Sequence, residues 1–228
     1  MLPDPLEETK LRKRLEKLNA CLISGQLDEA RAGFEQILAD YPGHPQALHG
    51  LGVLAVHEGR LDAGERLLRE AIAQEADNAR FWNDLGEALR LQQRYPEAIA
   101  AYRRALEAAP DFTPAANNLG VALAMTGALD EAEAELVAAT ERCQDDPFSW
   151  NSLGVVRQQL GRLEEALIAY ETAVRLKPDF AEALANYKDL LEAQPGLIEG
   201  SVRRLAELLK EQQEKAMQAS GKRVSQAS

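Results

Sequence analysis

The chain has 228 residues, of which 46% are hydrophobic, so it carries too much apolar material for a disordered protein. Acidic residues outnumber basic ones by 37 to 26, and the net charge of −11 argues against binding to nucleic acid or anionic lipid. Two cysteines are too few for a disulfide framework, and the acidic start and short apolar runs predict neither a secretory leader nor a membrane span. We therefore expect a soluble, cytoplasmic protein.

A Leu-Gly pair recurs every 34 residues, at Leu51-Gly52, Leu85-Gly86, Leu119-Gly120 and Leu153-Gly154. A fixed period of this length is typical of stacked repeat proteins. The register divides the chain into an N-terminal segment 1–10, five repeats (11–44, 45–78, 79–112, 113–146 and 147–180), C-terminal capping helices 181–218 and a flexible tail 219–228.

Each repeat is predicted to form two antiparallel helices. The first helix runs about 13 residues to a glycine, Gly25, Gly59, Gly127 or Gly161, which can adopt the left-handed conformation that closes a helix. Gln93 occupies this place in the third repeat, which predicts a different turn or mild strain there. The second helix opens with Leu-Asp-Glu-Ala or a related sequence, as at 27–30 and 129–132.

The two ends of the array differ from its middle, as stacked repeats require. The first helix of the first repeat is expected to act as an N-terminal cap. Residues 181–194 are expected to form one more first helix, which Pro195-Gly196 ends. An amphipathic helix follows to about residue 217, and it either caps the fifth repeat or docks on a partner; its apolar stripe is Ile198, Val202, Leu205, Leu208 and Leu209.

The repeated residues resemble the tetratricopeptide repeat family. The third repeat matches that family's pattern with Trp82, Leu85, Gly86, Ala98, Tyr102, Ala105 and Pro110, and the fifth matches it with Trp150, Leu153, Gly154, Ala166, Tyr170, Ala173 and Pro178. The resemblance implies an all-α fold, a right-handed superhelical solenoid of antiparallel helix hairpins. It further implies that the first helices line the concave side, and that the protein binds other proteins without catalysing a reaction.

Helical geometry then indicates which side chains of the first helices face a concave groove. The candidate groove residues are His49, Val53, Val56, Arg80, Asn83, Glu87, Arg90, Asn117, Asn118, Val121, Met125, Asn151, Val155 and Gln158, with Gln46, His57, Ala124, Phe148 and Gln159 beside them.

The asparagines at 83, 117 and 151 form a ladder of amides with a 34-residue spacing. Such a ladder either holds the backbone of an extended peptide or hydrogen-bonds to the neighbouring repeat. The valines and Met125 suggest a partly apolar groove for an amphipathic helix or a peptide with apolar anchors. Some family members grip an acidic carboxyl terminus with Lys and Arg, but only Arg80 and Arg90 are basic here, so that specificity is not expected.

No catalytic or cofactor motif is evident. The three histidines, His44, His49 and His57, lack the spacing of a metal site, neither Cys21 nor Cys143 has a histidine at a telling distance, and no phosphate-binding glycine loop occurs. We therefore predict a protein-interaction adaptor with no cofactor, no metal and no enzymatic activity. The alternatives are the substrate-recruiting subunit of a separately encoded glycosyl- or methyltransferase, and a scaffold that self-associates.

Overall fold

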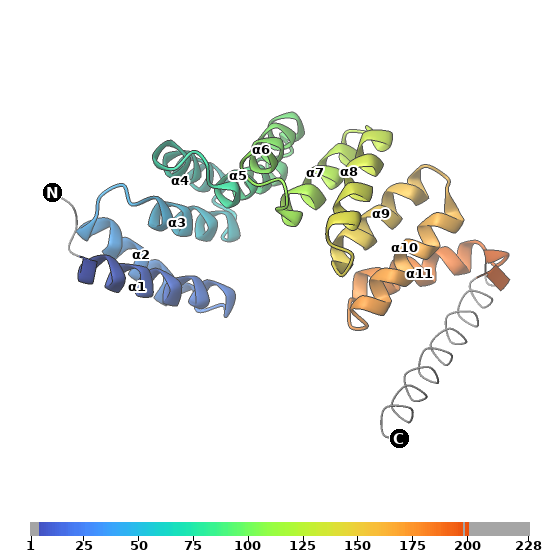
Figure 1. The fold of residues 1–228 in the computed structure, drawn as a ribbon, viewed down its shortest axis with the longest axis horizontal. Coiled ribbons are helices and arrows are strands. Elements are labelled where there is room, and N and C mark those ends of the chain that lie inside the picture. The colour runs from blue at the N-terminus through green and yellow to red at the C-terminus, as the bar shows by residue number, and fades with distance from the viewer. Residues whose placement is uncertain (1–4, 198, 201–228) are drawn as a thin grey trace, which may run out of the picture. The chain divides into compact units, whose positions relative to one another are not determined.

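The computed structural model describes residues 5–197 and 199–200, and this part of the chain contains eleven helices and no strands (Figure 1). The chain divides into two compact parts, residues 1–142 and residues 143–228. The first part holds α1 to α8, and the second part holds α9 to α11. The predicted all-helical fold is confirmed.

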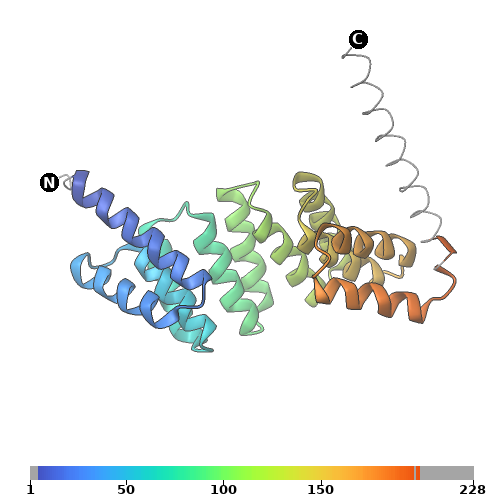
Figure 2. The ribbon, with the colours of Figure 1, turned by 90° about the horizontal axis from the view of Figure 1, so that it is seen from below.

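The helices alternate between a first and a second helix of each hairpin. The first helices are α1 (Pro5–Ile23), α3 (Pro45–His57), α5 (Ala79–Leu91), α7 (Thr113–Met125), α9 (Pro147–Gln159) and α11 (Ala181–Ala193). The second helices are α2 (Leu27–Asp40), α4 (Leu61–Gln74), α6 (Tyr95–Ala108), α8 (Leu129–Arg142) and α10 (Leu163–Leu176). In the first part, successive hairpins pack side by side (Figure 2).

The helix boundaries at the two ends of the array can be compared with those predicted from the sequence. Helix α1 begins at Pro5, so residues 5–10, expected to precede the first repeat, belong to its first helix. Helix α11 ends at Ala193, next to the predicted end of that helix. The predicted amphipathic helix from Ile198 to about residue 217 and the predicted tail 219–228 lie outside the described residues, apart from positions 199 and 200.

The turns inside the hairpins share one backbone conformation. Gly25, Gly59, Gly127 and Gly161 have φ angles of 78°, 77°, 82° and 76°, and Gln93 has a φ of 60° at the same place in its hairpin. The third repeat thus keeps the left-handed turn although its residue carries a Cβ atom, which is unfavourable in this region. Of the two outcomes predicted for this turn, a different conformation is wrong, and the positive φ of Gln93 is the conformation expected with mild strain.

Glycines on the first helices let large side chains of the second helices pack against bare backbone. A Cβ atom on Gly86 would lie 2.5 Å from the Tyr102 ring, and one on Gly154 would lie 2.6 Å from the Tyr170 ring. Both tyrosines are fully buried. The sequence predicts that small residues let the two helices of a hairpin approach closely. The structure adds that the side chain sixteen positions after each glycine, Tyr102 or Tyr170, packs against that glycine.

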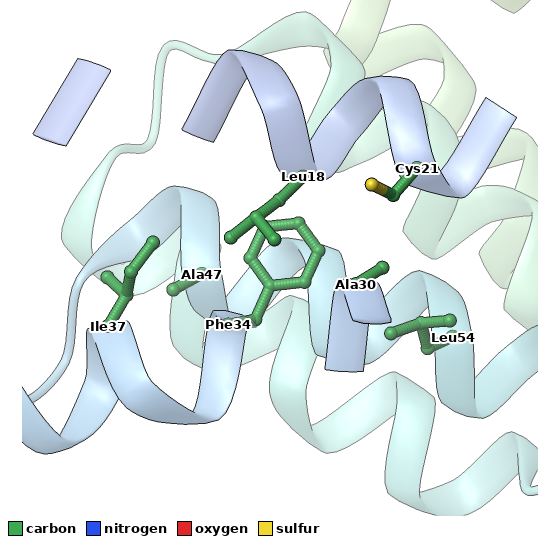
Figure 3. Close-up of a cluster of buried hydrophobic side chains, with 7 residues drawn as sticks. All are labelled: Leu18, Cys21, Ala30, Phe34, Ile37, Ala47 and Leu54. Carbon is green, nitrogen blue, oxygen red and sulfur yellow. The ribbon is translucent and has the colours of Figure 1, made fainter. Parts of the chain in front are cut away.

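The core is shared between neighbouring hairpins. In Figure 3, side chains of α1, α2 and α3 meet around the ring of Phe34, which is fully buried; the cluster is Leu18, Cys21, Ala30, Phe34, Ile37, Ala47 and Leu54. A separate cluster in the second part joins α10 and α11 through Ala166, Leu167, Tyr170 and Leu190. Because each hairpin buries its apolar surface against its neighbour, the core can form with few aromatic residues.

Candidate partner-binding surface

Within the first part, the first helices approach one another more closely than the second helices do. Helix α3 contacts α1 and α5, and α5 contacts α7, whereas no two of α2, α4, α6 and α8 are in comparable contact among the described residues. The first helices therefore form the inner side of this stack, where successive hairpins converge.

Side-chain hydrogen bonds join successive first helices in a regular series, which we call the inter-helix ladder. His49 Nε2 lies 2.6 Å from Asp84 Oδ2, Asn118 Nδ2 donates to Asn83 Oδ1 at 3.0 Å, and in the second part Asn186 Nδ2 donates to Asn151 Oδ1 at 3.0 Å. In every rung the two residues are 35 positions apart in the sequence. The ladder thus fixes the register between first helices.

This ladder corrects part of the sequence expectation. Asn83 and Asn151 are 8% and 4% exposed, and each also donates from Nδ2, to Asp84 and Glu182 respectively. His49 is also buried, and its ring stacks on Phe81 with 4.6 Å between centroids. These three side chains do not face an open groove, because their polar atoms are used to hold neighbouring helices together.

Asn117 occupies the same register and differs from the other two asparagines. It is half-buried, and its Oδ1 atom is inaccessible to solvent and accepts no hydrogen bond from a described residue. Asn118, next to it, is half-buried and donates to Asn83.

The third repeat carries the charged residues predicted for the groove, and one pair of them is internally neutralised. Arg90 Nε donates to Glu87 Oε2 at 2.8 Å and Arg90 Nη2 donates to Oε1 at 2.6 Å, while the Tyr102 hydroxyl donates to Oε2 at 3.3 Å. Burial, assisted by the Glu87 charge, raises the pKa of Tyr102. Arg80 is exposed and makes no ion pair with another described residue. Of the two arginines predicted for the groove, Arg80 is thus the one without an ion pair to a described residue.

The remaining predicted residues lie at or near the surface. Val53, Val56, Val121, Ala124 and Val155 are half-buried, and His57, Met125, Phe148, Gln158 and Gln159 are exposed. Gln46 is tied to Glu75 by a 2.7 Å hydrogen bond from its Nε2, and Gln158 Oε1 accepts from the Tyr170 hydroxyl at 2.8 Å. Phe148, Asn151, Val155, Gln158 and Gln159 belong to the second part, and the other candidates belong to the first.

The structure also shows a surface that sequence reasoning missed. An open hollow of about 650 Å³ lies between α1 and the start of α3; it is lined by Glu8, Thr9, Leu11, Arg12, Leu15, Glu16, Asn19, His44 and Gln46. Burial lowers the pKa of His44, against the raising effect of Glu75. The sequence predicts only a capping role for α1. Leu11 and Leu15, four residues apart on that helix, line the hollow and also pack against the first core cluster.

Metal-binding chemistry has no evident site in the described chain. No three His, Cys, Asp or Glu side chains among residues 5–197 and 199–200 come together in a way that could hold a metal ion. Cys21 is buried in the first core, and Cys143 Sγ lies 3.2 Å from Asp145 Oδ1.

Comparison with known families identifies the fold. Tetratricopeptide repeat models match residues 22–86, 89–153 and 147–180. The chain belongs to the tetratricopeptide repeat family. Such repeats form helix hairpins that stack through shared cores, as the hairpins described above do.

Individual tetratricopeptide proteins resemble parts of the chain. Human tetratricopeptide repeat protein 7B is 33% identical over 85 residues, which cover 37% of this chain and 10% of that protein. The chain thus matches only a tenth of the length of this curated relative. Among solved structures, TTC0263 of Thermus thermophilus has a TM-score of 0.67 at 24% identity, covering 79% of this chain and 98% of that one.

A second solved structure is YrrB, described as a tetratricopeptide repeat protein with an unusual peptide-binding site. Its TM-score is 0.59 at 24% identity, covering 77% of this chain and 90% of that chain. At this identity the likeness shows the fold alone. Separately, none of the helices within the described residues is both long enough and apolar enough to cross a membrane.

Proposed function

We propose that the chain binds a peptide or helix of a partner protein on the inner side of its first part. The tetratricopeptide fold supports a role as a protein–protein interaction scaffold and implies protein partners. YrrB, which shares the fold, is described by its peptide-binding site. The proposed surface comprises Val53, Val56, Arg80, Glu87, Arg90, Asn117, Asn118, Val121 and Met125.

The observation that carries this proposal is the apolar character of the half-buried inner positions. Val53 on α3 and Val121 on α7 keep part of their surface exposed on helices that converge, and Val56 is half-buried with its Cγ2 atom against Gly64 of α4. Between them, Glu87 and Arg90 neutralise each other. A partner therefore gains from apolar anchors and loses little by desolvating charge, so binding should depend only modestly on salt.

The experiment is affinity purification from a cell lysate with the Asn117→Ala, Val121→Glu double variant. The matched control is Val137→Glu, which places the same charge at a half-buried valine of the second helix α8 in the same repeat. Circular dichroism first establishes that both variants are folded. We expect the groove variant to lose the partners that the wild-type chain and the Val137 control retain. If the groove variant keeps every partner, this surface is not the binding site.

Tetratricopeptide repeat proteins are generally adaptors without catalysis, and we extend this expectation to the present chain. It therefore works either as an adaptor or as the recruiting subunit of a separate enzyme, and a purified sample should show no turnover. Light scattering across a range of concentrations tests the alternative of self-association. A cytoplasmic location stays a prediction of the sequence alone.

A further inference from the structure

Three exposed apolar side chains of the first part share one repeat register, and we call them the apolar row: Ile23, Leu91 and Met125. They are 89%, 43% and 57% exposed, and each is the last residue of its helix, α1, α5 or α7. The equivalent residue of α3 is His57, which is also exposed. Isolated exposed apolar residues are ordinary, but a series at one end of successive hairpins indicates an interaction surface.

The inner surface beside the row presents little free charge. Val56 directly precedes His57 of the row register, Ala124 directly precedes Met125, and both Val56 and Ala124 are half-buried. The equivalent residue of α5 is Arg90, which is bound by Glu87 through two hydrogen bonds. The side of a partner that touches the row must therefore be apolar.

The other edge of the row carries unpaired negative charge. Asp28, Asp62 and Asp130 each follow a row-register position by five residues, across the tight turn of the hairpin, and all three are exposed. None makes an ion pair or side-chain hydrogen bond with another described residue, although each lies in the first turn of its helix, where the helix dipole favours a carboxylate. Five residues span at most about 17 Å, so these carboxylates lie at the same end of the hairpins as the row.

Most cations at this end are engaged by other carboxylates: Arg31 and Arg60 bind Glu58, and Arg94 binds Glu65 and Glu97. Arg66, four residues after Asp62, is exposed and makes no ion pair with a described residue. The carboxylates of Asp28, Asp62 and Asp130 thus remain available to a partner that carries Lys or Arg beside its apolar residues.

We propose that the apolar row receives an amphipathic helix of a partner protein, with apolar residues on one face and Lys or Arg along the edge that meets the three aspartates. This inference rests on the function proposed above and names the chemistry of the partner. Neighbouring packed helices lie about 8–10 Å apart, and residues i and i+7 of a helix are about 10.5 Å apart along its axis. Large apolar residues seven positions apart on the partner would therefore reach Leu91 and Met125 on adjacent first helices.

The first test uses the full chain and a fluorescently labelled 18-residue model helix of leucine and lysine, with leucines at i, i+3, i+4 and i+7. Its counterpart has glutamate in place of every lysine. We expect fluorescence anisotropy to show binding of the lysine peptide, and the Ile23→Ser, Leu91→Ser, Met125→Ser variant to bind it about tenfold more weakly. The control variant Leu6→Ser, Tyr41→Ser, Ile168→Ser removes three other exposed apolar residues and should bind as the wild type does.

The second test separates specific from general attraction of a cationic peptide to an acidic protein. Asp28→Asn, Asp62→Asn, Asp130→Asn should reduce the preference for the lysine peptide over the glutamate peptide at least threefold. Glu35→Gln, Glu70→Gln, Glu141→Gln removes equal charge from exposed positions elsewhere on the second helices and should leave the preference unchanged. Equal effects of the two sets would overturn the proposal, as would equal binding of the two peptides.

The outcomes distinguish this inference from the broader function. If neither peptide needs the apolar row, but the Asn117→Ala, Val121→Glu variant still loses its lysate partners, the partner chemistry is wrong and the scaffold function stands. If the Asn117→Ala, Val121→Glu variant retains every partner, the scaffold function on this surface fails. Concentration-dependent dimers that the apolar-row variant abolishes would show that the row binds a second copy, and would overturn the proposal.

Discussion

The left-handed turn at Gln93 offers a direct test of how the hairpins are closed. Four equivalent turns have glycine at φ angles of 76° to 82°, while Gln93 adopts 60°. We predict that Gln93→Gly stabilises the protein. The substitution removes no side-chain hydrogen bond to a described residue, and it keeps the backbone bond from the residue 93 N–H to the Arg90 carbonyl at 2.8 Å.

The magnitude follows from two opposing contributions. Holding a residue with a Cβ atom in the left-handed region costs about 1–2 kcal/mol. Glycine in turn loses more backbone entropy on folding, which costs about 0.4–1 kcal/mol. The net gain in the free energy of unfolding is therefore about 0.5–1 kcal/mol, which corresponds to a rise in Tm of about 1–4 °C for a chain of this size.

Thermal and urea unfolding followed by circular dichroism at 222 nm measure this change. Gln93→Ala keeps the Cβ atom and should give no gain, and Gly59→Ala, at a φ of 77°, should lose a comparable amount of stability. A neutral or destabilising Gln93→Gly, measured beside a destabilising Gly59→Ala, would refute the reasoning.

Two further predictions concern polar contacts between hairpins. Asn83→Ala should lower the free energy of unfolding by about 1–2 kcal/mol, because it breaks the hydrogen bonds to Asn118 and Asp84. The control Asn19→Ala breaks no side-chain hydrogen bond to a described residue and should leave the urea midpoint nearly unchanged. Equal urea midpoints for the two variants would contradict a stabilising ladder. Burial alone would raise the pKa of Glu65, but hydrogen bonds from Gln92, Arg69 and Arg94 outweigh it and hold that pKa below the usual 4.5. The contribution of ionised Glu65 to the free energy of unfolding is therefore present above pH 4.5 and lost as pH falls. The Tm difference between wild type and Glu65→Gln should be largest near pH 7 and shrink below pH 4.5. A Tm difference that grows in acid would exclude this account.

The helices could be predicted from the sequence because their determinants are local and repeated five times over. Glycine closes most hairpin turns, and the 34-residue register places Gln93 in the equivalent turn of the third repeat, where the sequence left a different turn or mild strain open. The start of α1 at Pro5 was less accessible, because residues 5–10 have no counterpart in the later repeats from which the register was drawn.

The inner surface was harder to predict because helical geometry assigns a residue to a face without showing what covers that face. His49, Asn83 and Asn151 lie on the side of the first helix that faces the next first helix, and that contact depends on how the hairpins stack. Ile23 and Leu91, in contrast, share the register of Met125 and could have been found by stepping 34 residues at a time.

The inter-helix ladder also bears on how such an array can change in length during evolution. Each rung joins one position to the next position of the following repeat, and the block 79–112 carries halves of two successive rungs, Asp84 and Asn83. Loss of the block 79–112 would bring His49 opposite Asn118, and an imidazole and an amide can still hydrogen-bond. An insertion of one residue within a first helix would instead turn one half of a rung by about 100° from its partner. Whole-block duplications and deletions are thus the length changes that leave these junctions intact.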